Sequence, residues 1–200
     1  MQVRELKVDG ALEFTPPVYP DERGLFVSPF QGPAFAAATG GRFPLAQSNH
    51  SRSRRGVVRG VHYTRTPPGC AKYVYCARGS ALDMVVDIRL GSPTFGQVDS
   101  VLMDQQDFRA MYFPVGTAHA FVALEDDTVM SYLVTSSYVP ENELAISVTD
   151  PELALPLPDD LELTVSERDR VAMTLAEAQE QGLLPEYARC QAIEQRGRRS

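Results

Sequence analysis

The stretch VVRGVHYTRTPPGCAKYVY, residues 57–75, decides the fold class. It sets His62 and Lys72 among β-branched and aromatic residues, at positions where a strand would normally bury Val or Ile. The chain has only three histidines and two lysines, so one of each in neighbouring strand-like runs indicates a chemical use.

Similar short runs rich in Val and aromatic residues recur along the chain, separated by Gly, Pro, Asp and Ser. The predicted strands cover residues 25–30, 44–51, 56–64, 71–78, 81–90, 95–103, 108–114, 118–124 and 128–135. Strands at this spacing, without long helices between them, predict an all-β fold: a sandwich, jelly roll or barrel. Two helical pieces are expected, at 32–41 and at 174–187, where the spacing of Thr174 and Glu177 suits a capping box.

The length of 200 residues and the apolar fraction of 44% fit a single domain with a full core. We expect a C-terminal helical segment at 171–190 and a frayed tail at 191–200. The amino terminus lacks a signal-peptide pattern and no apolar run is long enough to cross a membrane, which predicts a cytoplasmic protein. Three cysteines without a CxxC pair suit a reducing compartment and support neither disulfides nor a zinc ribbon.

The charge is unevenly distributed. The net charge of −7 disfavours nucleic acid and anionic membranes as partners. Residues 23–82, however, contain nine basic residues and not one Asp or Glu, which suits a compact anion such as a diphosphate. For Arg52, Arg54 and Arg55 a solvated basic face is the better interpretation, whereas Arg59 and Lys72 lie within strand-like runs.

A second motif, FPVGTAHAF at 113–121, has the Pro, Gly and His spacing of the second cupin motif. A cupin metal site would also need an HxH pair, which the sequence lacks. Convergence of His50, His62 and His119 on a metal is the less favoured alternative. Neither a GxGxxG after a strand nor a P-loop is present.

Several motifs together resemble the dTDP-4-dehydrorhamnose 3,5-epimerase family in order and spacing: QSNHSRSRRGVVRGVHYT, AKYVYCARGSALDMVVDIRLGSPTFGQ, YFPVGTAHAF, YLVTSSYVPENE, and DPELAL followed by VSERD. The similarity covers roughly residues 1–175, and the tail TLAEAQEQGLLPEYARCQ resembles the branch that serves antibiotic deoxysugars such as epivancosamine. The resemblance implies a metal-free cupin jelly roll that forms a homodimer. It also implies an epimerase, without cofactors, of a dTDP-linked 4-keto-6-deoxyhexose.

The resemblance to the antibiotic branch favours inversion at carbon 5, with carbon 3 inverted as well or instead as an open possibility. The ordinary double epimerase of rhamnose biosynthesis is the first alternative. A metal-dependent cupin oxygenase and a non-catalytic sugar-nucleotide binding module are alternatives from other classes.

Four residues match the catalytic positions of the family. A proton beside a ketone is weakly acidic, so the reaction needs a base, a group that stabilises the enolate oxygen, and an acid on the opposite face. By resemblance, His62 is the base and Asp169 orients its imidazole, while Lys72 lies near the keto oxygen and Tyr132 is the acid. From the residues alone, a surface turn residue is the better interpretation of Asp169, and a packed aromatic is the commoner fate of a strand tyrosine such as Tyr132.

The resemblance also assigns substrate contacts, including Arg23 and Phe26 from a segment that reaches into the partner subunit. The other candidate contacts are Gln47, Asn49, Arg59, His119, Tyr138 and Glu143. Glu143 could instead be an exposed charge at a strand edge. Ala120 and Ser137 depart from the family pattern near the sugar and base pockets, which suggests an altered sugar.

Overall fold

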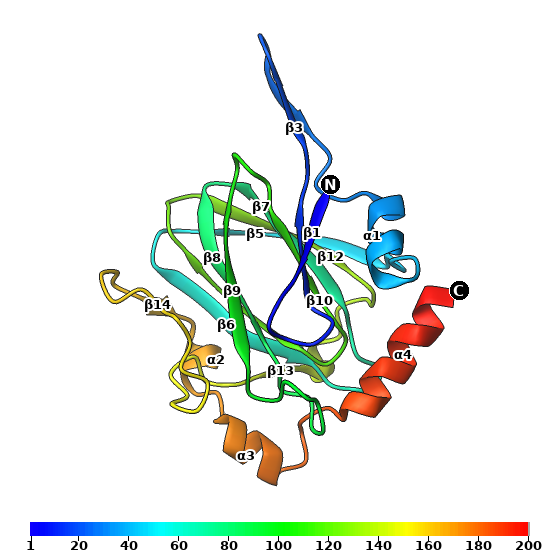
Figure 1. The fold of residues 1–200 in the computed structure, drawn as a ribbon. Coiled ribbons are helices and arrows are strands. Elements are labelled where there is room, and N and C mark those ends of the chain that lie inside the picture. The colour runs from blue at the N-terminus through cyan, green and yellow to red at the C-terminus, as the bar shows by residue number, and fades with distance from the viewer. Residues whose placement is uncertain (200) are drawn as a thin grey trace.

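Two six-stranded sheets packed face to face form the body of the molecule (Figure 1). The computed structural model describes residues 1–199. The first sheet runs in the order β1 (Gln2–Glu5), β2 (Leu12–Thr15), β10 (Ala110–Phe113), β7 (Lys72–Arg78), β12 (Thr128–Val134) and β5 (Gln47–Ser53). The second runs in the order β13 (Glu143–Ala145), β6 (Val57–Thr64), β11 (Ala118–Ala123), β8 (Ser80–Val86) and β9 (Val98–Asp104), with β14 (Thr164–Val165) also paired to β6. The fold is the predicted all-β jelly roll.

The core between the sheets follows from the alternation of apolar side chains along the central strands. Val74, Met130 and Phe113 from the first sheet meet Val85 and Phe121 from the second, and all five are almost fully buried. Because successive side chains of a strand point to opposite faces, the same strands also present apolar residues outward, and each outer face must be covered.

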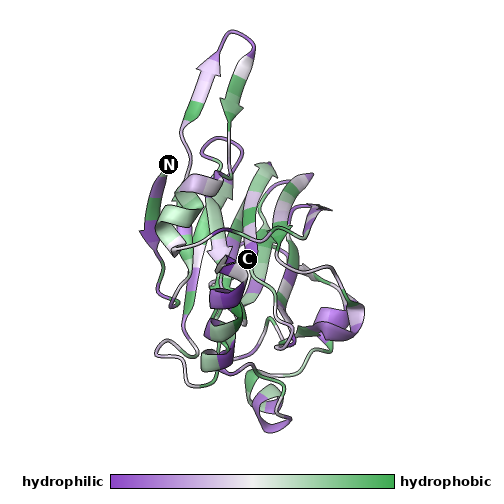
Figure 2. Cartoon of the chain, turned by 90° about the vertical axis from the view of Figure 1, so that its right-hand side faces the viewer, coloured by the Kyte–Doolittle hydropathy of each residue, from purple (hydrophilic) through white to green (hydrophobic). Residues whose placement is uncertain are grey.

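The outer face of the first sheet is covered by α1 (Gly32–Thr39) and α4 (Tyr187–Arg199), as Figure 2 shows from the side. Phe35 of α1 stacks on Phe14 and meets the ring of Tyr112 edge-on. Cys190 of α4 is buried in the same cluster, and Glu194 accepts a hydrogen bond of 2.9 Å from the Tyr112 hydroxyl.

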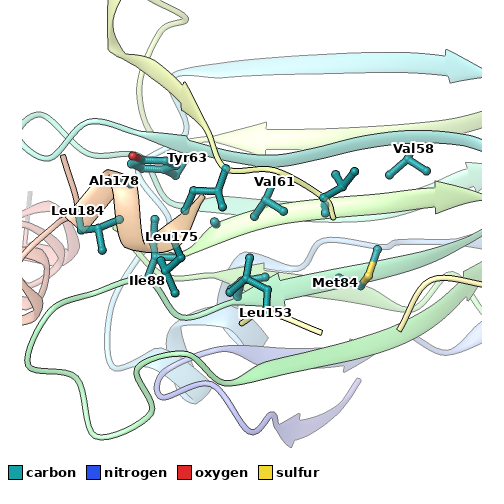
Figure 3. Close-up of a cluster of buried hydrophobic side chains, with 14 of the residues drawn as sticks. Val58, Val61, Tyr63, Met84, Ile88, Leu153, Leu175, Ala178 and Leu184 are labelled. Carbon is teal, nitrogen blue, oxygen red and sulfur yellow. The ribbon is translucent and has the colours of Figure 1, made fainter. Parts of the chain in front are cut away.

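The outer face of the second sheet is covered by the segment 146–186, which includes α2 (Glu167–Arg170) and α3 (Leu175–Glu180). Figure 3 shows how Leu153, Leu175 and Ala178 of this segment pack against Val61 and Ile88. This segment places α2 against β6, so residues 167–170, which are distant from β6 in the sequence, contact the second sheet.

A two-stranded hairpin, β3 (Val18–Asp21) and β4 (Gly24–Val27), projects from the body (Figures 1 and 2). Tyr19, Leu25 and Phe26 are 59%, 49% and 66% exposed on it. A single hairpin has no hydrophobic core of its own in which to bury these side chains. Neighbouring apolar side chains that are exposed in this way are typical of an interaction surface.

Eight of the nine predicted strands are confirmed in the two sheets, as β5 to β12, with shifts at their ends. The expected strand 81–90 ends at Val86, because the Asp87 carboxylate accepts hydrogen bonds from Arg89, Ser92 and Thr94 and turns the chain. The expected strand 25–30 ends at Val27 as half of the hairpin. The strands before residue 24 and the short strands β13 and β14 were not predicted.

Of the predictions for the C-terminal region, the helix start at Thr174 is right and the frayed tail is wrong. The capping box of Thr174 and Glu177 is confirmed at the start of α3. The expected tail at 191–200 is wrong for 191–199, because α4 runs to Arg199 and Arg198 donates to the Thr39 carbonyl at 2.6 Å; Ser200 lies outside the described residues. Within residues 1–199, every helix is too short or too polar to cross a lipid bilayer.

Candidate active site

A cavity of about 230 Å³ opens between the two sheets. Eight of the predicted site residues line it: Asn49, Arg59, His62, Lys72, His119, Tyr132, Tyr138 and Glu143. Lys72 and Tyr132 come from β7 and β12 of the first sheet, whereas His62 and His119 come from β6 and β11 of the second. A molecule held in the cavity therefore has one sheet on each side.

A bulge in β6 aims its side chains into this cavity. His119 pairs with His62 and Phe121 with Arg59, so two residues of β6 lie opposite the single Ala120 of β11. Arg59 and His62, three residues apart, consequently face the same cavity, which a regular strand would not allow. Gly60 makes the bulge possible, because its φ of +139° disfavours other residues and a Cβ there would overlap Ala120.

The imidazole of His62 is hydrogen-bonded to Asp169, which lies outside the cavity lining. The His62 Nε2 lies 2.7 Å from Asp169 Oδ1, and the Asp169 side chain is only 4% exposed. Ser166 caps α2 by accepting from the Asp169 amide at 3.1 Å, which fixes this helix turn. Burial works against ionisation of Asp169, but hydrogen bonds from His62, Ser166 and the Gly60 amide hold its pKa below the usual range.

It follows that the carboxylate of Asp169 is an acceptor at neutral pH and the proton of the neutral imidazole resides on Nε2. Nδ1 then carries the free lone pair, so His62 has the form that a general base requires. The alternative of a surface turn residue does not hold for Asp169.

Tyr132 presents its hydroxyl from the opposite sheet. The phenol oxygen lies 3.1 Å from the Ser51 hydroxyl, and either atom can donate. Burial raises the pKa of Tyr132, and nearby Asp83 adds to that effect. The phenol is therefore protonated at neutral pH, as a proton donor must be.

His119 forms a second, deeper pair. Its Nε2 lies 2.5 Å from Asp83 Oδ1, its ring meets Phe113 edge-on, and both members are almost fully buried. Burial raises the pKa of Asp83 and lowers the pKa of His119, so the charged form of each partner is disfavoured. Lys72 adds the positive charge at this end of the cavity.

The remaining lining residues form the more open end. Arg59 Nε donates to the Ser53 hydroxyl at 3.1 Å, which leaves part of its guanidinium for a ligand. Glu143 accepts from the Thr64 hydroxyl at 3.1 Å and lines the cavity instead of pointing away from a strand edge.

At the same end, Gln47 lies just outside the cavity lining. Its amide donates to Asn49 at 2.6 Å and accepts from the Tyr138 backbone at 3.1 Å. Tyr138 lines the cavity and is 56% exposed.

Two further predicted residues do not line this cavity within the chain. Arg23 and Phe26 lie on the projecting hairpin, and Arg23 pairs only with Asp21 of the same turn. Their expected contribution needs a second subunit.

Three residues that position the site were not predicted: Ser51, Ser53 and Asp83. A signal for the serines was present, because QSNHSRS at 47–53 is a strand with polar residues on both faces. Asp83 gave a weaker signal as the one acid inside the apolar run ALDMVV.

The three histidines do not form a metal-ligand set. His119 is bonded to Asp83, and His50 Nδ1 lies 2.9 Å from the Ser131 hydroxyl. Across residues 1–199, no group of three or more His, Cys, Asp or Glu side chains could hold a metal ion.

Comparison with known proteins gives one family. The model of the dTDP-4-dehydrorhamnose 3,5-epimerase family matches residues 5–177. A dTDP-4-dehydrorhamnose 3,5-epimerase from Mycolicibacterium smegmatis is 47% identical over 200 residues, covering 100% of this chain and 98% of the relative. A dTDP-4-dehydro-6-deoxyglucose 3-epimerase from Streptomyces bikiniensis is 45% identical, covering 95% of this chain and 97% of the relative.

Solved structures agree with this match. The Mycobacterium tuberculosis rmlC epimerase superposes with a TM-score of 0.93 at 45% identity, covering 96% of this chain and 98% of that one. ChmJ, a 3'-monoepimerase from Streptomyces bikiniensis in complex with dTDP-quinovose, gives a TM-score of 0.93 at 44% identity, with 98% of each chain covered.

Proposed function

The chain belongs to the dTDP-4-dehydrorhamnose 3,5-epimerase family and is an isomerase, and on this premise we propose that it epimerises a dTDP-linked 4-keto-6-deoxyhexose in antibiotic deoxysugar biosynthesis. One observation carries the proposal: a base-competent imidazole and a protonated phenol face one cavity from opposite sheets. Inversion needs proton removal on one face of the sugar ring and proton delivery on the other.

The proposed reaction has two proton transfers. His62 Nδ1 takes the proton from a carbon beside the ketone, and Asp169 stabilises the imidazolium that forms. Lys72 offsets the negative charge that develops on the keto oxygen. Tyr132 then gives its phenolic proton to the opposite face of the same carbon. The oxidation state of the sugar is unchanged, so the reaction uses no redox cofactor.

The open end of the cavity suits the nucleotide. Arg59 offers part of a planar guanidinium, which binds phosphate oxygens in pairs. The exposed ring of Tyr138 can stack on a thymine, with Gln47, Asn49 and Glu143 as polar neighbours and His119 toward the sugar.

The active form is proposed to be a homodimer. The hairpin exposes Tyr19, Leu25 and Phe26, and a partner subunit would bury them. Arg23 at its tip would add a second cation to the partner's diphosphate site. Light scattering should give a dimer for the native chain and a monomer with weakened dTDP binding for Phe26→Asp; a monomeric native chain with full activity would refute this part.

Proton NMR in heavy water tests the reaction itself. Incubating dTDP-4-keto-6-deoxyglucose with the protein should remove the carbon 5 signal, with slower loss at carbon 3, and His62→Ala should lose both exchanges while still binding dTDP. No exchange by the native protein, with dTDP bound, would point to a binding module or to a more heavily modified sugar.

A second candidate, inversion at carbon 3, is favoured by the relatives named 3-epimerases, one of them 45% identical. Faster exchange at carbon 3 in the same experiment selects this candidate. Comparable exchange at both carbons selects the double epimerase of the rhamnose pathway.

A further inference from the structure

The inner face of β5 carries a row of polar side chains, and one of them holds the proposed acid. Tyr132 pairs directly with Asn49 across the strands, so Ser51 is its diagonal neighbour on the cavity face. The Ser51 hydroxyl, 3.1 Å away, is the one hydrogen-bond partner that the described chain gives to the Tyr132 phenol. Ser51 is half-buried and lines the cavity, so it also meets whatever solvent enters there.

Two other polar side chains that line the cavity have partners elsewhere in the chain. The Arg59 guanidinium donates to the Ser53 hydroxyl and to the Arg52 carbonyl. The Thr64 hydroxyl donates to Glu143. Of the residues described, only Ser51 places a side-chain hydroxyl within hydrogen-bond distance of the Tyr132 phenol.

The proton balance of the proposed reaction creates a need for such a hydroxyl. One C–H bond breaks and its proton goes to His62, and a new C–H bond forms with the proton of Tyr132. The enzyme is then left with an imidazolium and a phenolate on opposite sheets. Before the next turnover, His62 must lose a proton to water and the phenolate must regain one.

Resting on the proposed function, we propose that Ser51 is a positioning residue that orients the Tyr132 phenol, donates to the phenolate and relays a proton to it from water in the cavity. Burial around Tyr132 makes the phenolate costly, and a hydroxyl donor is the group that lowers this cost. Ser51 acts through Tyr132 and does not touch the reacting carbon.

The test separates proton exchange from inversion, because His62 alone can exchange a proton with retention of configuration. In heavy water, Ser51→Ala should keep exchange of the 4-keto sugar within about threefold and lose inversion about 10- to 100-fold, the effect of one hydrogen bond to a charged group. Ser48→Ala is the matched control, a serine of the same strand that is exposed on the other face.

A double-mutant cycle completes the test. Because Ser51 acts through Tyr132, adding Ser51→Ala to Tyr132→Phe should change neither rate further. Equal loss of exchange and inversion in Ser51→Ala, no loss of either, or a further loss in the double variant would each overturn the inference. Failure of the native protein to exchange any proton would instead refute the proposed function, and Ser51 with it.

Discussion

Replacing Asp169 by Asn tests the pair that prepares the base. The amide has the size of the carboxylate and fits a site where the side chain is 4% exposed, so the fold should be retained. An amide oxygen can still accept from His62 Nε2, but it carries no charge to stabilise the imidazolium. If the amide nitrogen turns toward the ring, the imidazole proton moves to Nδ1, where the base must act.

The expected loss follows from the geometry. The 2.7 Å hydrogen bond joins a buried carboxylate to a ring that becomes cationic. Such a bond contributes about 1.5–3 kcal/mol, which corresponds to about 10- to 150-fold in rate. The assay is the initial rate of proton exchange at saturating 4-keto sugar, followed by NMR in heavy water.

The control is Glu167→Gln, an acid of the same short helix whose side chain is 75% exposed. It should change the rate less than threefold, and both variants should bind dTDP like the native chain. An Asp169→Asn enzyme within threefold of native exchange would refute the role of Asp169. Equal loss of dTDP binding would show that the substitution damages the pocket instead of the base.

Three further predictions concern stability, each measured by urea unfolding followed by circular dichroism. Asp87→Ala should lose about 3–5 kcal/mol, because Arg89 is 3% exposed and would be left as an unpaired buried charge. Gly116→Ala should lose more than Gly91→Ala: both glycines have φ near +80°, which costs other residues about 1–2 kcal/mol, but only at Gly116 would a Cβ overlap Cys190. Hydrogen bonds to Asp87 outweigh its burial and hold its pKa below the usual range. Its contribution is therefore complete above about pH 4, is lost as the pH falls through the lowered pKa, and should vanish from the acid limb of the stability profile in Asp87→Asn.

The strands and the capping box were predictable because they depend on local patterns. Period-two alternation and turn residues mark the strands of the body, and the Thr174 spacing marks the start of α3. The extent of α4 was not predictable in this way. Its polar sequence is held by distant groups, such as Glu194 bonded to Tyr112, that no local window contains.

The site was predicted mainly by resemblance. His62 and Asp169 are separated by 107 positions, and no spacing rule brings them together. A regular strand would have turned His62 away from Arg59, and the bulge at Gly60 is what places both in one cavity. Partners such as Ser51 were missed because a serine has no signature beyond its place in a polar strand.

The division of the site between two sheets makes the hydrophobic core a determinant of the chemistry. Packed sheets lie about 10 Å apart, a spacing set by the side chains between them. Met130 and Val85 fill that space beside the residues that face the cavity, and neither of them lines the cavity itself. Changing their volume would alter the separation of His62 from Tyr132, and with it the carbon that both can reach. Selectivity between the two carbons that flank the ketone could thus be altered by substitutions that never contact the substrate.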